Sequence, residues 1–260
     1  MRRMLLCLLL LAALAGCASV PAPFQANQAN QPGLDYARIS PFPDSVVHAL
    51  RVDLQTVRIS VSPPAERGKS VDQMQSSSGA LASINVSFFN KAFDVRGITI
   101  SDGQAWAPVF EVPKSPLLAC DAAQRCQIEL KPEQARPGWH NVMAGTPWLL
   151  DHGRQRTAED DASCKNLCAM THPRTAVGLD ATGRYLIIAL AEGRRPPVLG
   201  LTLVQLSAVM AQLGAVDAIN LDGGGSSTLL LQGRSVMERP FNEPALRKVA
   251  NALHLFAKPR

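Results

Sequence analysis

The sequence predicts a single α+β domain, of mixed α/β character, built around a mixed and mainly antiparallel sheet with few flanking helices. Short apolar or alternating segments recur along the chain between turn residues, which is the pattern of many strands. Only one clear helical pattern interrupts them. No second change of composition divides residues 35–260, and a segment of that length can form one large hydrophobic core.

The strands are predicted from period-two alternation and from turn signals. Val57, Ile59 and Val61 alternate with polar residues inside the β-branched segment 46–61. Asp-Gly at 102–103 and Asp-Ala-Thr-Gly at 180–183 predict hairpin turns. The other predicted strands are residues 80–84, 98–104, 109–112, 126–130, 142–150 (interrupted by Gly145 and Pro147), 175–179, 185–191, 218–221 and 249–256.

Two helices are predicted. Residues 71–77 form a short one that leads into the strand at 80–84. The second begins after Thr202, whose hydroxyl can cap the first turn, and ends at Gly214, a residue typical of helix C-termini. One face of this second helix carries Leu203, Leu206, Met210 and Leu213.

Residues 1–17 predict a lipoprotein signal peptide. Arg2 and Arg3 precede an apolar stretch at 5–14 that is too short to span a bilayer. Leu-Ala-Gly-Cys at 14–17 resembles the lipobox of bacterial lipoproteins, in which the thiol of Cys17 would be acylated. An ordinary secretory signal is the alternative. By resemblance to the bacterial sorting pattern, Ala18 favours the outer membrane, so we expect a lipid-anchored envelope protein that faces the periplasm.

Residues 18–34 predict a flexible tether between this anchor and the domain at 35–260. The tether is rich in Pro, Ala, Asn and Gln and has few charges. The formal net charge of +5 includes two arginines of the signal peptide, so the mature chain is only modestly basic. Since no block of five Lys or Arg residues occurs, the sequence gives little support to nucleic acid binding.

Four cysteines remain after the signal peptide, and an even number in an exported protein predicts two disulfides. The local pairs are the simplest of the three possible connectivities. A zinc site with four thiolates is the less favoured alternative, because neither spacing matches a zinc knuckle. The four residues are Cys120, Cys126, Cys164 and Cys168.

The most informative segment is a Gly-rich turn at 219–228. In it Asp222 follows a predicted strand and is followed by Gly223, Gly224, Gly225 and Ser226. Glycines allow a ligand to approach the backbone closely, and successive N–H groups in such a turn can form a concave site for anions. A tight hairpin with no ligand is the structural alternative.

Three further segments combine polar groups with a strand end. Asn85 begins the sequence Asn-Val-Ser-Phe-Phe, residues 145–149 read Gly-Thr-Pro-Trp-Leu, and residues 172–178 read His-Pro-Arg-Thr-Ala-Val-Gly. The planar guanidinium of Arg174 is suited to bidentate phosphate binding. Each segment alone is also compatible with a purely structural role.

In their order along the chain, these segments resemble the phosphodiester glycosidase family. The resemblance includes two more segments, Gly-Leu-Thr-Leu at 200–203 and Asn-Leu-Asp-Gly-Gly-Gly-Ser at 220–226. The resemblance covers about residues 45–256. Two departures concern the substrate more than the reaction: Val86 and Ser87 stand where small residues are common, and Glu192-Gly193-Arg194 stands where Asp-Gly-Arg is common.

The resemblance implies cleavage of a sugar-1-phosphodiester, for example one of N-acetylglucosamine, between the anomeric carbon and the phosphodiester oxygen. Asp222 would be the nucleophile or the base, ionised at neutral pH, Glu192 the second carboxylate, and His172 an alternative acid or phosphate ligand. Arg174 and the three glycine N–H groups would bind the phosphate. Hydrogen bonds to the sugar or the phosphate would come from Asn85, Thr175 and Ser226.

Two alternatives belong to other classes. The first is a non-catalytic lipoprotein that binds phosphorylated glycans or assists exopolysaccharide assembly. The second is a metal-dependent phosphodiesterase, which is less favoured because the sequence has no His/Asp cluster with ligand spacing. We therefore expect a glycan or sugar-phosphate substrate, no metal and no other cofactor.

Overall fold

The computed structural model of the protein describes Phe24 and residues 32–110, 115–162, 164 and 166–259. The predicted signal peptide with Cys17 lies outside the described residues, as does most of the segment 18–34. Phe24 is buried and packs in an apolar cluster of the domain. No helix in the described part of the chain is long and apolar enough to cross a membrane.

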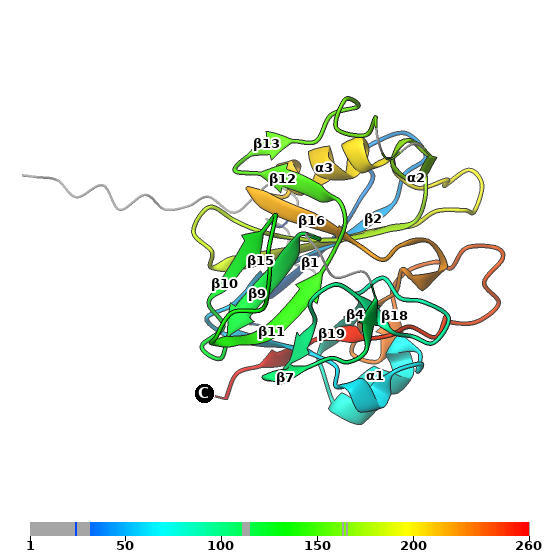
Figure 1. Cartoon of the computed structure of the whole chain (residues 1–260). Coiled ribbons are helices and arrows are strands. Elements are labelled where there is room, and N and C mark those ends of the chain that lie inside the picture. Colours follow the sequence, from blue (N-terminus) through cyan, green and yellow to red (C-terminus); the bar gives the residue numbers. More distant parts are fainter. Residues whose placement is uncertain (1–23, 25–31, 111–114, 163, 165, 260) are drawn as a thin grey trace, which may run out of the picture.

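A seven-stranded antiparallel sheet forms the centre of the fold (Figure 1). Its second to fifth strands are paired over most of their length. In spatial order the strands are β1 (Leu34–Ile39), β2 (Val47–Asp53), β15 (Tyr185–Ala191), β14 (Arg174–Leu179), β16 (Asp217–Leu221), β12 (Trp148–Asp151) and β13 (Arg154–Gln155).

Two five-stranded antiparallel sheets and one two-stranded parallel sheet complete the β structure. The first has the order β10 (Cys126–Glu129), β9 (Leu117–Asp121), β11 (Trp139–Ala144), β6 (Ile100–Ser101) and β7 (Gln104–Ala105). The second has the order β18 (Arg234–Ser235), β17 (Leu229–Leu231), β4 (Ala82–Asn85), β19 (Ala252–Ala257) and β3 (Val57–Val61). The parallel pair is β5 (Val95–Arg96) with β8 (Val109–Phe110).

The helices cover the outer faces of these sheets. Helix α3 (Leu203–Gln212) lies on one side of the seven-stranded sheet, and α1 (Val71–Ser78) lies at the far side of the second five-stranded sheet (Figure 1). A capping box closes the start of α3, because Thr202 Oγ1 accepts from the N–H of Gln205 while Gln205 Oε1 accepts from the N–H of Thr202. The shorter helical elements are α2 (Asn166–Ala169) and the 3-10 turns η2 (Pro64–Glu66) and η3 (Gly224–Ser226).

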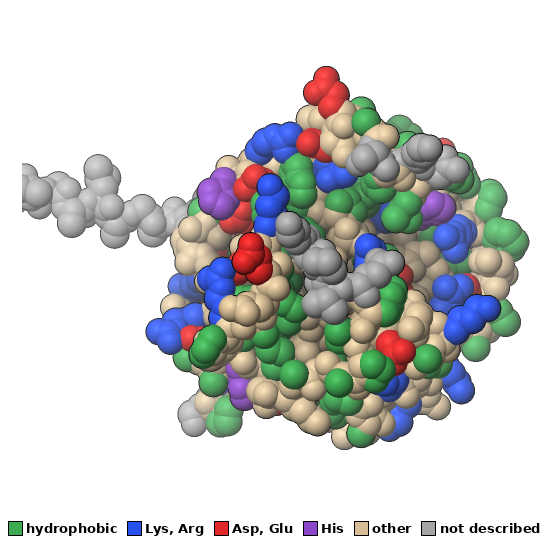
Figure 2. Space-filling view, in the orientation of Figure 1, with side chains coloured by type: hydrophobic (Ala, Val, Ile, Leu, Met, Phe, Trp, Pro, Cys, Tyr) green, Lys and Arg blue, Asp and Glu red, His purple; other side chains and the backbone are tan. Residues whose placement is uncertain are grey.

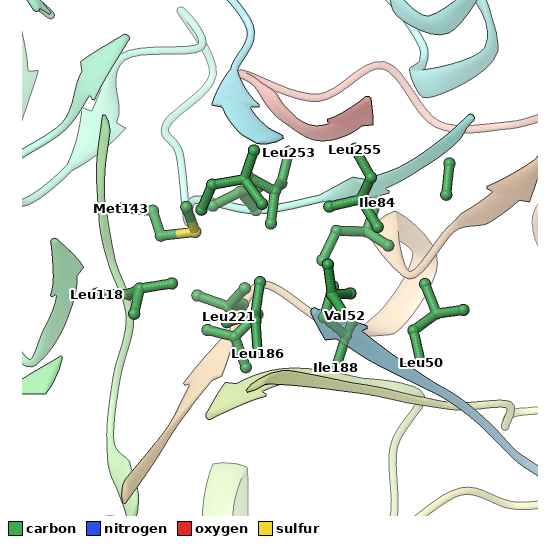
Figure 3. Close-up of a cluster of buried hydrophobic side chains, with 14 of the residues drawn as sticks. Leu50, Val52, Ile84, Leu118, Met143, Leu186, Ile188, Leu221, Leu253 and Leu255 are labelled. Carbon is green, nitrogen blue, oxygen red and sulfur yellow. The ribbon is translucent and has the colours of Figure 1, made fainter. Parts of the chain in front are cut away.

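Both faces of the central sheet are buried, because successive side chains of a strand point to opposite faces. Along β15, Ile188 and its i±2 neighbours belong to the cluster between the sheets, whereas Ile187 and Ala189 pack toward α3. Figure 3 shows the first cluster, in which side chains from the central sheet meet those of both five-stranded sheets. This cluster fixes how the sheets lie against each other.

The predicted abundance of strands, their antiparallel pairing and the small number of helices are confirmed. The predicted organisation around one sheet is wrong in detail, since the strands divide among several sheets. The described strands also include β1 and β9, which lay outside the predicted set. Alternation along a strand shows which faces are buried but not which strand lies beside it, so the division into sheets could not be predicted.

The two local disulfides are confirmed. Cys120 and Cys126 are directly opposite each other on β9 and β10, and Cys164 pairs with Cys168 at α2. All four of these sulfurs are therefore used in disulfides, and the four-thiolate zinc site is wrong.

Replacing Ile188 by alanine should destabilise the protein strongly. The side chain is fully buried between three sheets, and removal of a buried Ile side chain costs about 2–5 kcal/mol. Urea denaturation of Ile188→Ala should show this loss, with the exposed Lys91→Ala as a control that stays close to the native protein. A change as small as that of the control would contradict the assigned core.

Candidate active site

A cavity of about 220 Å³ opens where β14 begins and β16 ends. Six polypeptide segments contribute to it: the segment after β4, α2, the segment that leads into β14, the loop after β15, the Gly-rich turn, and the loop between β18 and β19. Its lining is Phe88, Leu167, His172, Pro173, Arg174, Arg194, Asn220, Leu221, Asp222, Gly223, Gly224, Gly225 and Arg247. Of the carboxylates in the described chain, only that of Asp222 is among these residues.

The position of Asp222 is fixed through its backbone. Its N–H donates to the carbonyl oxygen of Val86 at 2.9 Å, and its own carbonyl oxygen accepts from Nδ2 of Asn85 at 2.6 Å. Asn85 is the last residue of strand β4 and Val86 follows it, and β4 belongs to another sheet. The Gly-rich turn is therefore held between the central sheet and the second five-stranded sheet.

Asn85 uses its whole side chain to organise this region. Its Oδ1 accepts from the hydroxyl of Thr175 and from the N–H of Thr228, both at 3.1 Å. The side chains of Asn85 and Thr175 are fully buried and neither lines the cavity. The structure brings the two predicted substrate-binding residues to the site, but as supports of the turn, because their polar atoms are bonded to protein groups.

The Gly-Thr-Pro segment supports the turn from the other side. The N–H of Thr146 donates to the carbonyl oxygen of Asn220, and Nδ2 of Asn220 donates back to the carbonyl oxygen of Thr146. Gly145 has to be glycine, since a Cβ there would collide with the backbone of Asn220. Oδ1 of Asn220 is buried without a hydrogen-bond partner in the described structure, and the residue lines the cavity beside Asp222.

The carboxylate of Asp222 lies in a poorly solvated position. Burial raises its pKa to about 6, against the hydrogen bond from the Ser226 side chain, the positive charge of Arg247 and the hydrogen bond from the Gly223 N–H, all of which lower it. Asp222 is therefore mainly ionised at neutral pH but takes up a proton in mild acid. Ser226 is buried and acts on this carboxylate directly.

The three glycines allow neighbouring protein groups to approach closely, and two of their N–H groups are bonded to protein atoms and not left free for an anion. The N–H of Gly224 donates to the carbonyl oxygen of Pro173, and that of Gly223 is directed to Asp222. A Cβ on Gly223 would lie 2.6 Å from the Pro173 oxygen, and Gly224 has a φ of +61°. A Cβ on Gly225 would overlap side chains of the loop that carries Arg247. The N–H groups of Gly223 and Gly224 therefore have protein partners, and the use of all three N–H groups for phosphate stays a prediction.

Positive charge surrounds the carboxylate. The guanidinium of Arg194 lies over Gly224, and Nη2 of Arg194 is 3.4 Å from Nδ1 of His172. Arg247 reaches the turn near Gly225 and also pairs with Glu243. Burial, helped by nearby arginines, lowers the pKa of His172, so the ring is mainly neutral at pH 7 and is not a ready proton donor.

Arg174 lines the cavity and also holds neighbouring backbone segments by hydrogen bonds. Its guanidinium donates to the carbonyl oxygens of Leu201, Leu167 and Met170 at 2.7–3.0 Å. Burial lowers its pKa to about 10, which still leaves it charged at neutral pH. Arg174 therefore combines a fixed positive charge at the cavity wall with support of the α2 segment.

Glu192 lies away from the cavity in a buried polar network. Its Oε1 accepts from Nε2 of His48 and from the N–H of Glu238, and its Oε2 accepts from Arg195. Burial raises the pKa of this carboxyl, but these three donors outweigh it and hold the pKa below its usual value. The structure thus does not bring Glu192 together with Asp222. It gives Glu192 the role of joining β2 and β15 to the loop at 236–249.

Sequence reasoning missed two arginines of the cavity. Arg194 attracted notice only as a neighbour of Glu192, and Arg247 lies in a loop without any motif. Arg194 follows the end of β15 by three residues, and β15 pairs with β14, which carries Arg174. That pairing is the signal that would have placed Arg194 near the site.

One group of possible metal ligands occurs among the described residues, at Asp151, His152 and Asp217. The His152 side chain is almost fully exposed and none of the three lines the cavity. Asp217 begins β16 and Asp222 follows its end, so the two sites are separated by the length of the strand, about 16 Å at about 3.3 Å per residue.

Comparison with known proteins identifies the family. The family model for phosphodiester glycosidases matches residues 78–256, which is more than half of the chain and includes the whole cavity. The chain belongs to the phosphodiester glycosidase family. The family resemblance of the sequence motifs is thereby confirmed.

Individual relatives match over shorter stretches. The chain is 34% identical over 102 residues to the mouse N-acetylglucosamine-1-phosphodiester alpha-N-acetylglucosaminidase, a match that covers 35% of this chain and 19% of the mouse protein. It is 31% identical over 103 residues to the SPbeta prophage-derived uncharacterized protein YomE of Bacillus subtilis strain 168, covering 38% of this chain and 15% of that protein. The matches thus span less than a fifth of these relatives.

Similarity of fold extends further than similarity of sequence. The catalytic domain of the zebrafish N-acetylglucosamine-1-phosphodiester alpha-N-acetylglucosaminidase, solved in a form auto-inhibited by its pro-peptide, superposes with a TM-score of 0.72 and 19% identity over 89% of this chain and 86% of that one. A putative exported protein of Burkholderia pseudomallei K96243 gives a TM-score of 0.64 and 17% identity, over 82% of this chain and 74% of that one. These values establish a shared fold.

The pKa of Asp222 predicts a pH-dependent cost to stability. Because the folded-state pKa of about 6 is above the usual 3.8, the folded protein loses stability as the pH rises through this range, and the full cost is present above pH 6. Asp222→Asn should therefore be more stable than the native protein at pH 7.5, by about 2–3 kcal/mol, and no more stable near pH 4. Denaturation at both values would measure this, with the exposed Glu133→Gln as a charge-matched control. Equal gains at both pH values would contradict the buried carboxylate.

The network around Glu192 predicts a structural effect without a catalytic one. Glu192→Gln places an amide group among three donors, so at least one donor loses its partner, which costs about 1–3 kcal/mol. Thermal denaturation should show this loss, while kcat of the folded variant changes by a few-fold at most. A kcat reduced by orders of magnitude in a stable Glu192→Gln protein would restore Glu192 as a reacting group.

Proposed function

We propose that this protein is a hydrolase that cleaves the glycosidic bond of a sugar-1-phosphodiester. The observation that carries the proposal is the cavity itself, in which the carboxylate of Asp222 lies among the cationic groups of Arg174, Arg194 and Arg247. A phosphodiester substrate is anionic, so the arginines supply complementary charge, and Asp222 is the group that can act on the sugar. Membership of the phosphodiester glycosidase family supports the same reaction.

In this mechanism the arginines stabilise the departing phosphate monoester. As the bond to the anomeric carbon breaks, negative charge grows on the phosphate, and Arg194 and Arg247 at the cavity wall can donate to it. Because the phosphate monoester leaves as a stable anion, the reaction needs little help from a general acid. This agrees with a cavity whose lining includes one carboxylate and a mainly neutral His172.

Asp222 serves as the nucleophile or as the base that activates water, since both roles require its ionised form. The unpartnered Oδ1 of Asn220 beside it is available to accept a hydrogen bond from a sugar substituent after a small adjustment. N-acetylglucosamine is the sugar that we propose to test first, because relatives with matching sequences carry it in their names.

We also propose that the protein acts in the bacterial envelope, anchored through Cys17 and facing the periplasm from the outer membrane. The support is the lipobox-like sequence at 14–17 and the even number of cysteines in the domain. The disulfides at Cys120–Cys126 and Cys164–Cys168 agree with an oxidising compartment.

Asp222→Asn should abolish turnover while leaving the fold intact. Purified protein is incubated with UDP-N-acetylglucosamine and with an aryl N-acetylglucosaminyl phosphodiester, and release of the free sugar is measured. Loss of the ionisable group should lower kcat by at least about 10²–10⁴-fold. In the native protein kcat/KM should rise with pH around a midpoint near pH 6, because the free enzyme needs ionised Asp222.

Hydrolysis by Asp222→Asn at the native rate would remove Asp222 from the mechanism. If the native protein releases no sugar from a panel of glycosyl phosphodiesters but binds phosphorylated glycans, the protein is a binding module and the hydrolase proposal fails.

A further inference from the structure

The cavity is bordered by an unusual set of exposed apolar side chains. Among the described residues, four large hydrophobic side chains are strongly exposed, at 47%, 51%, 52% and 77%, and we call them the apolar rim: Leu167, Met170, Leu199 and Phe241. They come from three segments, α2, the loop after β15 and the loop between β18 and β19. Figure 1 shows these three segments at the same end of the molecule, and Figure 2 shows apolar and basic side chains beside one another there.

One half of the apolar rim is attached to Arg174. Nη2 of this arginine donates to the carbonyl oxygens of Leu167 and Met170, at 2.7 and 2.9 Å. The disulfide between Cys164 and Cys168 adds a second constraint to the same short segment. Leu167 also lines the cavity directly. These apolar side chains are thus held in place next to a cavity arginine.

The other half is attached to Arg194. The backbone N–H of Arg194 donates to the carbonyl oxygen of Leu199 at 3.2 Å, and its carbonyl oxygen accepts from the N–H of Phe241 at 3.3 Å. Each of the four rim residues is therefore bonded, through its own backbone, to an arginine that lines the cavity. Basic and apolar groups form one preformed surface, and preformed contacts reduce the entropy lost on binding.

The size of the cavity leaves part of the substrate outside. At about 220 Å³ it is smaller than the 300–1,000 Å³ that is typical of clefts enclosing a whole ligand of drug size. A sugar and its phosphate fill such a space, and the group on the other side of the phosphate must extend beyond it. That group meets the apolar rim. Single exposed apolar side chains are common on protein surfaces, whereas several gathered beside a cavity indicate a binding surface.

We propose that the substrate is a sugar-1-phosphodiester whose second ester group is a hydrocarbon chain, with the apolar rim as the binding surface for that chain. This inference rests on the proposed function and adds the chemical class of the aglycone. The sugar and phosphate occupy the cavity, and the chain runs over Leu199 and Phe241, the two most exposed side chains of the rim. Burial of each methylene group favours binding, so affinity should increase with chain length.

The test compares two substrates that differ only in the aglycone. N-acetylglucosamine-1-phosphate methyl ester and decyl ester are supplied as monomers, below the concentration at which the decyl ester forms micelles. The native protein should hydrolyse the decyl ester with a kcat/KM at least tenfold higher. Phe241→Ser and Leu199→Ser should each reduce this ratio at least threefold while leaving the methyl ester rate unchanged. The matched control Phe241→Leu keeps an apolar side chain and should keep the ratio.

Failure of this inference can be distinguished from failure of the proposed function. Equal kcat/KM for the two esters would overturn the apolar aglycone and leave the hydrolase in place. If neither ester is hydrolysed, isothermal titration with decyl phosphate and with inorganic phosphate decides. Tighter binding of decyl phosphate that Phe241→Ser abolishes would support the rim, and equal binding would overturn it.

A third measurement separates the chain of a substrate from a bilayer surface. Sedimentation with phosphatidylethanolamine–phosphatidylglycerol vesicles is measured for the native protein and for Phe241→Ser. Vesicle binding that depends on Phe241, with equal rates on the two monomeric esters, would show that the apolar rim contacts membranes and would overturn the aglycone site.

Discussion

The side-chain amide of Asn85 is the interaction on which the rest of the site depends. It joins the last residue of β4 to the backbone of Asp222, to Thr175 on β14 and to the N–H of Thr228 at the end of the turn. These groups come from two sheets and are far apart in the chain. Because the amide is fully buried and both ends of it are bonded, its geometry leaves the Gly-rich turn little freedom.

This arrangement separates the residues that support the site from those that face a ligand. Asn85, Thr175 and Ser226 hold the turn and the carboxylate, whereas Asp222 and the arginines line the cavity. The division explains why a motif of small and polar residues surrounds the single carboxylate of the proposed mechanism. A reacting group has to be held within a fraction of an ångström, and the supporting hydrogen bonds do this.

Much of the site was predictable because its segments carry local signals. Asp222 follows an apolar strand and precedes three glycines, and Arg174 precedes another strand, so both were placed at strand ends from the sequence. Arg247 could not be found in this way, because it lies in a loop and reaches the turn only through tertiary contacts. Glu192 shows a limit of this reasoning, since an acidic residue at a strand end is just as well suited to a buried ion network.

The fold was predictable to a similar depth and for a similar reason. Turn residues and apolar periods located α3, β14, β15 and β16 within a residue or two. The distribution of strands over several sheets depends on pairing between distant segments, such as β4 with β17 and β19. A single sequence contains no direct record of such pairing.

The contrast between the floor and the edge of the cavity has a consequence for how the protein can change. A Cβ at Gly145 or Gly223 would collide with the backbone of a neighbouring segment. The floor of the cavity, which these glycines help to support, therefore has almost no freedom to vary in sequence. The side chains at 199 and 241 are strongly exposed to solvent. If the proposed mechanism holds, new substrate preferences can be acquired at the edge, one side chain at a time, without disturbing the geometry around Asp222. In evolutionary terms, the chemistry is held constant while the choice of substrate remains adjustable.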